Sequence, residues 1–305
     1  MTSFAEMRKR NSDVTAITQE LEKLNKKADY SSDDDRFWQP TVDKAGNGSA
    51  TIRFLPESPK DGVEGKQYVR VWNHGFKSAS GQWYIENCPT TIGGTCPVCE
   101  NNGILWHSGI DDNKKIVSTR KRKLLYISNI LVINDPAKPE NNGKVKLFRY
   151  GKKIFDMIES KMNPPFPDDI PYNPFCMETG ANFKLRARKF EGNRNYDLSS
   201  FDAPTPLFGG DMDKQEQLWN QEYSVLEFIK PSEFKDYETL KKRFDFVIGN
   251  QASSSSQPRT TVQSTPQYED ELPNFSSPMR SDPPPTFASS VEEDEDLDFF
   301  RSLAS

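Results

Sequence analysis

The chain has 305 residues, of which 28% are charged and 34% hydrophobic, and its mean hydropathy is -0.79. This length allows two domains, but the composition is too polar for one packed core throughout, so we expect part of the chain to remain disordered. No stretch is apolar enough to cross a bilayer, and residues 1–10 lack the apolar segment of a secretory signal. These features predict a cytoplasmic protein.

The net charge of -5 conceals two parts of opposite sign. Residues 251–305 hold three basic and ten acidic residues, which leaves residues 1–250 with a net charge of +2. Between Lys66 and Lys153 there are fifteen Lys or Arg against six Asp or Glu, a net of +9. Such a concentration of positive charge predicts a surface that binds a polyanion.

The first segment, residues 1–36, combines positive charge with a helical apolar pattern. Its basic end and the apolar positions that follow are Arg8, Lys9, Arg10, Asn11 and Ser12, then Val14, Ile17, Leu21 and Leu24. The three-four spacing predicts an amphipathic helix, entered through Ser12 or Asp13. A short helix is marginal alone, so its apolar stripe should dock either on the body of the protein or on a neighbouring copy.

Residues 37–250 form the predicted folded body, which is mainly β with some α. Segments rich in β-branched and aromatic residues, separated by turn residues, are 51–55, 68–72, 83–86, 124–133, 145–150 and 182–190. Helical patterns follow at 152–162, 211–219 and 237–248, and Gly249 is expected to end the last helix. Together these patterns predict a small barrel with helices packed against it.

A candidate metal site lies within the body. Its ligands are His74, Cys88, Cys96 and Cys99, separated by thirteen, seven and two residues. Three thiolates and an imidazole fill the four positions of a tetrahedral Zn²⁺ and leave none for water, which predicts one structural zinc. Gly93 and Gly94 permit the sharp turn before the Cys96–Cys99 pair. The alternatives are a pair of disulfides or four unrelated residues.

The metal site falls between two predicted strands. We therefore expect an inserted zinc subdomain, at about residues 66–123, rather than an independent finger. The remaining cysteine, Cys176, is expected to be buried.

Basic residues interleaved with aromatic ones predict a groove for a single nucleic-acid strand. Arg120, Lys121, Arg122 and Lys123 precede the strand that begins at Leu124, and on a later strand Lys184, Arg186 and Arg188 share one face, with Lys189 beside them. The interleaved aromatics are Trp72, Trp83, Tyr84, Tyr126, Phe148, Tyr150 and Tyr196, about half of which should fill the core. Cations follow the phosphates and exposed rings stack on bases, without reading the sequence.

From residue 251 onward the chain is rich in Ser and Pro and then becomes acidic. Its last cluster is Glu292, Glu293, Asp294, Glu295, Asp296, Asp298, Phe299 and Phe300. This composition predicts a disordered arm, and the paired phenylalanines favour a recognition tip for partner proteins over a merely solubilising tail.

Two other function classes are weaker. An enzyme, such as a nuclease, is disfavoured because His107 is the only other histidine and no nucleophile motif, Walker loop or carboxylate–histidine cluster is present. A single-stranded RNA-binding regulator of translation remains an alternative, because a stacking groove that does not read the 2′-hydroxyl accepts either nucleic acid.

Several short motifs occur in an order that resembles a known family. They are the Ile-Arg-Phe-Leu-Pro of 52–56, the His-Gly-Phe-Lys of 74–77, the Trp-Tyr-Ile-Glu of 83–86, the Cys-Pro-Val-Cys of 96–99, the Asn-Ile-Leu-Val of 129–132, the Gly-Lys-Lys-Ile of 151–154 and the Gly-Ala-Asn-Phe of 180–183. With these motifs the chain resembles the helix-destabilising single-stranded DNA-binding proteins of T-even bacteriophages, the gene 32 protein family.

The resemblance implies a fold and a set of partners. It implies an OB-fold core with an inserted zinc subdomain at residues 37–250, and a basic arm at residues 1–36 that makes cooperative protomer contacts through Arg8 to Ser12. It also implies a tail at 251–305 that recruits replication and recombination proteins, such as a polymerase, helicase loader, primase or recombinase. The family's function would be to coat unpaired DNA in replication, recombination and repair.

Individual site residues also follow from the resemblance. It implies that Tyr84, Phe148 and Tyr196 face DNA. One departure is that Leu124 and Leu125 follow the basic triplet at 121–123, where the family has hydroxyl residues. Asn193 and Val117 stand where rings are expected, which predicts a smaller stacking surface.

Overall fold

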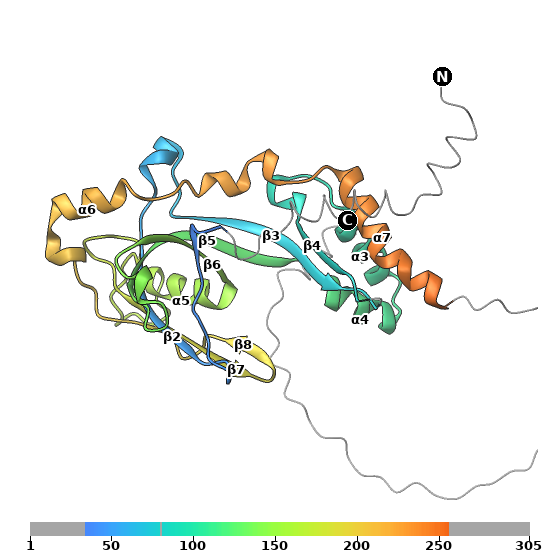
Figure 1. The fold of residues 1–305 in the computed structure, drawn as a ribbon, viewed down its shortest axis with the longest axis horizontal. Helices are drawn as coiled ribbons and strands as arrows, with labels where there is room; N and C mark the ends of the chain where they lie inside the picture. Colours follow the sequence, from blue (N-terminus) through green and yellow to red (C-terminus); the bar gives the residue numbers. More distant parts are fainter. Residues whose placement is uncertain (1–33, 80, 256–305) are drawn as a thin grey trace, which may run out of the picture.

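The computed structural model describes residues 34–79 and 81–255 (Figure 1). Its strands are β1 (Phe37–Trp38), β2 (Gly48–Phe54), β3 (Tyr68–Lys77), β4 (Trp83–Asn87), β5 (Lys123–Asn134), β6 (Val145–Gly151), β7 (Phe183–Phe190), β8 (Asn193–Asn195) and β9 (Ser200–Phe201). Its α-helices are α3 (Pro97–His107), α4 (Asp111–Arg120), α5 (Lys152–Met162), α6 (Met212–Trp219) and α7 (Tyr237–Ser255). In these described residues, no helix has both the length and the apolar character that a membrane span needs.

Strand β5 organises the sheet, because it pairs with three other strands. Strand β6 runs antiparallel along one edge of β5. The other edge is shared: β3 pairs with residues 123–128 and β2 with residues 130–134. Strand β2 then continues the sheet to β7 and β8, while β3 extends beyond β5 to form a hairpin with β4. In Figure 1 this hairpin projects away from the rest of the sheet.

The largest core cluster lies between the sheet and α5. Alternating residues of β2, β5, β6 and β7 point into it, as expected for strands with one buried face. It is rich in aromatic rings: Phe54 contacts Tyr150, Phe175 and Phe183 at centroid distances of 5.5–5.8 Å. Burying a ring of this size removes a large apolar area from water, so these contacts stabilise the main body of the fold.

A second core cluster lies at the far end of the β3–β4 hairpin, where α3, α4 and α7 gather around it (Figure 1). Phe76 and Tyr84 stack with a centroid distance of 5.1 Å, and Phe244 of α7 packs edge-on against both rings. Glu86 of β4 binds Lys235 and Arg243 at 2.8 and 2.9 Å, which fixes the chain around α7 to the hairpin. We call this group of elements the metal lobe.

Most predicted elements are confirmed within a few residues, including the six long strands and helices α5 and α6. Helix α7 has the predicted apolar face, with Leu240, Phe244 and Val247 buried, but Gly249 does not end it. Helices α3 and α4 were not predicted, because neither carries a regular apolar stripe. Pro97 at the first turn of α3 was the available signal.

Hydrogen bonds join the end of α6 and the segment after it to the loop before β3. Trp219 Nε1 donates to the Glu57 carbonyl at 2.8 Å, and Val225 N donates to the Asp61 carboxylate at 3.1 Å. Glu222 lies between them with 0% exposure, and neither carboxylate oxygen has a hydrogen-bond partner in the described chain. Burial, and then the nearby carboxylates of Glu57 and Asp61, raise the pKa of Glu222 to about 9.

We predict that Glu222→Gln flattens the pH dependence of stability. The Glu222 carboxyl stays protonated in the folded chain until about pH 9 but ionises near pH 4.5 when unfolded. The unfolded state is therefore favoured as pH rises through this window, by up to ~1.4 kcal/mol per pH unit. Urea unfolding at pH 6 and pH 8.5 should show a smaller loss of stability in Glu222→Gln. Exposed Glu216→Gln is the control, and equal losses in all three proteins would contradict the prediction.

Candidate metal centre and nucleic-acid interface

Three segments of the metal lobe bring the four predicted metal ligands together. His74 lies on β3, and Cys88 precedes the 3₁₀ helix η2 (Pro89–Ile92) directly after β4. Cys96 is the N-cap residue of α3, and Cys99 lies in its first turn. Gly93 adopts φ +78°, a left-handed conformation that favours glycine, and so turns the chain from η2 back towards α3.

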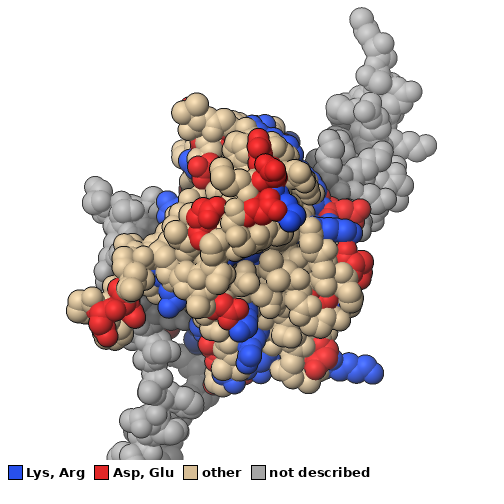
Figure 2. Space-filling view, turned by 90° about the vertical axis from the view of Figure 1, so that its left-hand side faces the viewer, with Lys and Arg blue, Asp and Glu red and all other residues tan. Residues whose placement is uncertain are grey.

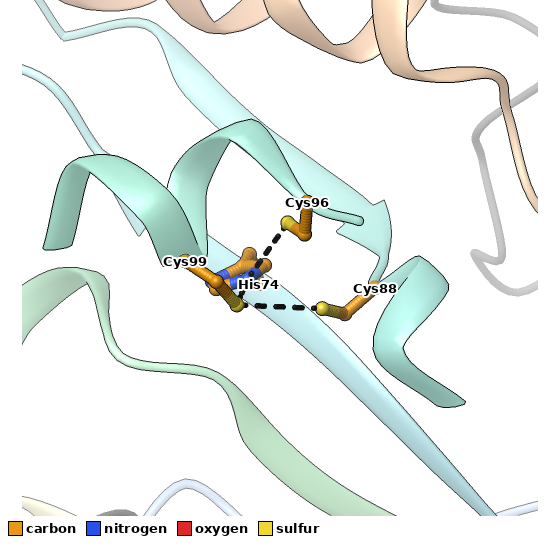
Figure 3. A group of neighbouring side chains, drawn as sticks. All are labelled: His74, Cys88, Cys96 and Cys99. Carbon is orange, nitrogen blue, oxygen red and sulfur yellow. Dashed lines mark hydrogen bonds between the residues drawn. The ribbon is translucent and has the colours of Figure 1, made fainter. Parts of the chain in front are cut away.

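The four ligand atoms converge in a closed, buried group (Figure 3). His74 Nε2 lies 3.5 Å from Cys96 Sγ and 3.3 Å from Cys99 Sγ, and Cys88 Sγ lies 3.6 Å from Cys99 Sγ. All four atoms lie within 4.8 Å of one another. The sulfur separation far exceeds the ~2.05 Å of a disulfide bond, so the thiols face one common centre instead of forming a bridge.

Hydrogen bonds outside this group orient its ligands. His74 Nδ1 lies 2.9 Å from the Arg120 carbonyl, and a carbonyl only accepts, so Nδ1 carries the proton and Nε2 offers its lone pair to the centre. Asn102 donates to the same carbonyl at 3.2 Å. Hydrogen bonds with Cys96 and Cys99 lower the pKa of the Cys88 thiol, while those with Cys88 and Cys96 raise the pKa of Cys99, so Cys88 ionises before Cys99.

This geometry fits a metal ion held by four protein ligands. Three soft sulfur ligands and one imidazole suit a tetrahedral ion, and their number leaves no position for a substrate or water. An ion bound there would join β3, η2 and α3.

Of the seven interleaved aromatics, four are buried, which agrees with the expectation that about half fill the core, but Tyr84 and Phe148, which the resemblance assigns to DNA, are among them. Tyr84, Tyr126 and Phe148 are 1%, 4% and 1% exposed, so these rings pack in the two core clusters and present no face to a base. Tyr150 is also buried, whereas Tyr196 is half-buried at the edge of the main core. The prediction failed for Tyr84, Tyr126 and Phe148 because strand alternation gives two faces without indicating which one is covered.

The four basic residues at 120–123 differ in burial: the first is buried and the other three are partly or fully exposed. Arg120 is 8% exposed, and its guanidinium lies over Phe76 and Phe244 at 5.6 and 5.9 Å, so it belongs to the core of the metal lobe. Arg122 stacks on Trp72 at 4.0 Å and donates to Thr90 Oγ1 at 2.8 Å. Lys121 is half-buried and Lys123 is exposed at the start of β5. The pairing of Trp72 with Arg122 was not predicted, because fifty residues separate them in the sequence.

The cations of β7 share one face, as predicted. Lys184 and Arg186 are exposed while Leu185 and Ala187, between and after them, are buried. Lys184 pairs with Asp202 at 2.5 Å, and Arg188 pairs with Asp197. Both ion pairs are partly exposed and therefore weak, so a phosphate can compete for these cations.

The two basic segments do not lie on neighbouring strands, because β2 separates β5 from β7. A strand of nucleic acid that contacts both segments must therefore cross the face of the molecule between the metal lobe and the β7–β8 hairpin. Figure 2 shows that at the α6 end of the molecule, by contrast, acidic and basic side chains alternate without a patch of one sign.

The remaining predicted residues lie outside the metal lobe and its basic run. Cys176 is half-buried rather than buried, and its sulfur accepts a hydrogen bond from Thr179 N. Lys189 is exposed at the end of β7. The predicted protomer-contact residues, Arg8 to Ser12, and the acidic tail cluster, residues 292–300, lie outside the described residues.

Comparison with known proteins assigns the family. The family model described as "gp32 DNA binding protein like" matches residues 46–248. The chain belongs to the gp32 family. A single-stranded DNA-binding protein of Enterobacteria phage T2 is 38% identical over 252 residues, which cover 81% of each chain. The protein of that description in Enterobacteria phage T4 is 38% identical over 239 residues, or 76% of this chain and 77% of the relative. A third relative, from Escherichia phage SV14, is 44% identical over 96 residues.

We predict that this gp32 family member retains one equivalent of bound metal per chain and that Cys99→Ser loses it. Serine offers no thiolate, so the site would keep only three of its ligands. The metal lobe should then unfold at a lower temperature, because metal binding contributes directly to its folding. Metal content can be measured by inductively coupled plasma mass spectrometry and stability by thermal melting.

Cys176→Ser is the matched control, since Cys176 lies outside the ligand group. A Cys99→Ser protein with unchanged metal content would show that these residues do not hold the ion.

Proposed function

We propose that the chain binds single-stranded DNA without sequence preference. The observation that carries this proposal is 38% identity, over about four-fifths of both chains, to a relative described as a single-stranded DNA-binding protein. The basic residues on β7 and before β5 support it, because they offer cations along a path between the metal lobe and the body. We also propose that the ion of the metal centre is Zn²⁺ and that the sheet of the body is an OB-fold barrel.

The proposed mechanism consists of binding alone, without a chemical reaction. Phosphates would bind Lys121, Arg122, Lys123 and the cations of β7, and their counterions would be released into solution. Among the predicted aromatics in the described residues, Tyr196 and Trp72 are half-buried and Trp83 is exposed, so these rings can still meet a base. Because only unpaired strands would be bound, the protein would shift the melting equilibrium of duplex DNA by mass action, without ATP.

We assign separate roles to the two ends of the chain. We propose that residues 1–36 mediate cooperative contacts between protomers along the strand, through Arg8 to Ser12. We propose that residues 251–305 recruit replication, recombination and repair proteins through the acidic cluster and through Phe299 and Phe300. Residues 37–250 would then form the DNA-binding core.

Direct titration tests the proposed function. We expect the full chain to bind a fluorescein-labelled oligo(dT) strand more tightly than a duplex of equal length. Affinity should fall with salt, with a slope of about -0.7 in log K against log salt for each phosphate contacted. Fluorescence anisotropy across a salt series measures both quantities. Equal affinity for duplex and single strand would refute the proposal, and a preference for matched RNA would favour the RNA-binding alternative.

We also predict that deleting residues 288–305 raises affinity for oligo(dT) at low salt. The deleted segment holds six acidic residues and one arginine, so it would compete with DNA for the basic surface. The gain should disappear at high salt, where the attraction is screened. Phe299→Ala with Phe300→Ala is the control, because it keeps the charge of the tail. Unchanged affinity after the deletion at low salt would contradict the prediction.

A further inference from the structure

A cavity of about 620 Å³ lies at the start of β3. None of the residues that line it is among the proposed DNA contacts on β7 and at residues 121–123. It is lined by residues 65–70, by Glu57 and Ile229, and by Trp72 and Thr91. Its size falls in the range of small-ligand sites. Lys66 and Arg70 are exposed and line it with one carboxylate, Glu57, so the charged side chains of the lining have a net charge of +1.

One edge of β3 opens into this cavity. Trp72 N donates to Thr91 Oγ1 at 2.9 Å, and the Trp72 carbonyl accepts from Cys88 N at 2.8 Å, so the main chain of Trp72 faces away from β5. Polar groups alternate along an antiparallel strand, and those of Tyr68 and Arg70 therefore face this same edge. Within residues 34–79 and 81–255, no strand pairs with β3 there. The edge thus offers N–H donors to a ligand.

Trp72, which lines the cavity, belongs to a preformed stack. The Arg122 guanidinium lies 4.0 Å from the centre of the Trp72 ring, and its hydrogen bond to Thr90 Oγ1 keeps it there. Trp72 is half-buried, because its ring also packs against the core of the metal lobe. Arginine planes and aromatic rings are the two surfaces on which proteins stack unpaired bases.

The cations beside this stack are available to an anion. Among the described residues, neither Lys66 nor Arg70 forms an ion pair, in contrast to Lys184 and Arg188 of β7. Arg70 lies two residues from Trp72 on the same face of β3. A phosphate at Arg70 and a base at the Trp72–Arg122 stack would therefore be neighbours, as they are within one nucleotide.

We propose that this cavity is a subsite for one nucleotide of a bound single strand. Arg70 and Lys66 bind its phosphate, together with N–H groups of the open edge of β3, and the base stacks on the Trp72–Arg122 pair. The proposal rests on the proposed function and adds a base-stacking site to it. An extended peptide is the competing occupant of an open strand edge. A peptide would bind that edge through main-chain hydrogen bonds alone, whereas the arginine–tryptophan stack and the two cations match the base and the phosphate of a nucleotide.

Substitutions at two positions separate the parts of the subsite. Trp72→Leu removes the ring, and we expect oligo(dT) affinity to fall about 5- to 150-fold with the salt slope unchanged, because stacking releases no counterions. Trp72→Phe, which keeps an aromatic face, should recover part of that loss. Arg70→Gln should instead reduce the salt slope by about 0.7, the value for one phosphate contact. Fluorescence anisotropy with the full chain, over a salt series, measures all four proteins.

Matched controls lie outside the cavity. Trp106→Leu removes a half-buried tryptophan of α3, and Lys214→Gln removes a cation of α6, at the other end of the molecule (Figure 1). Both should bind like the unmodified chain. Arg70 is exposed, so its substitution tests the subsite even if thermal melting shows that Trp72→Leu is destabilised.

The outcomes distinguish the subsite from the function. If the unmodified chain binds oligo(dT) while Trp72→Leu and Arg70→Gln match their controls, the subsite is wrong and the proposed function stands. If the unmodified chain does not bind, both are wrong. If Trp72→Leu loses affinity only for a peptide of residues 288–305, the cavity binds a peptide and the proposal is overturned.

Discussion

The convergence of four ligand atoms in the metal lobe is the constraint on which that part of the structure depends. Helices α3 and α4 have no regular apolar stripe, so hydrophobic burial alone does not explain why they fold against the β3–β4 hairpin. The ligands join β3, η2 and α3 directly. The bond from His74 Nδ1 to the Arg120 carbonyl then adds the end of α4 to the same group. The ligand group thus adds to the hydrophobic core of the lobe a set of contacts that hold α3 and α4 in place.

The connection between the body and the metal lobe depends on the length of β5. Its first half carries the hairpin of the metal lobe through β3, and its second half carries the main sheet through β2. Because one continuous strand spans both, the lobe and the body are joined by main-chain hydrogen bonds rather than by a flexible linker. Any strand of DNA that bridges them therefore meets two surfaces in a fixed relation, which lowers the entropic cost of binding.

Sequence reasoning succeeded where one local pattern determines one outcome. Ligand spacing identified the four metal ligands, and period-two or helical spacing located the long strands and three helices. It failed where the outcome depends on which face is covered: Tyr84 and Phe148 look like Tyr196 in sequence, but only the structure shows that the first two are buried. Pairs distant in sequence, such as Trp72 and Arg122, were also beyond its reach, because no local pattern encodes them.

The proposed nucleotide subsite and the metal centre are linked by position in the chain. Trp72 lies two residues before His74, Thr90 two residues after Cys88, and Arg122 two residues after Arg120, whose carbonyl holds the His74 ring. Each part of the Trp72–Arg122 stack is therefore placed by a neighbour of the metal site. An ion bound by the four ligands would contact no nucleotide in the proposed subsite, but it would fix the walls against which a base would stack. The metal centre would then favour nucleic-acid binding through preorganisation, because the ring and the guanidinium would already be held together before the strand binds.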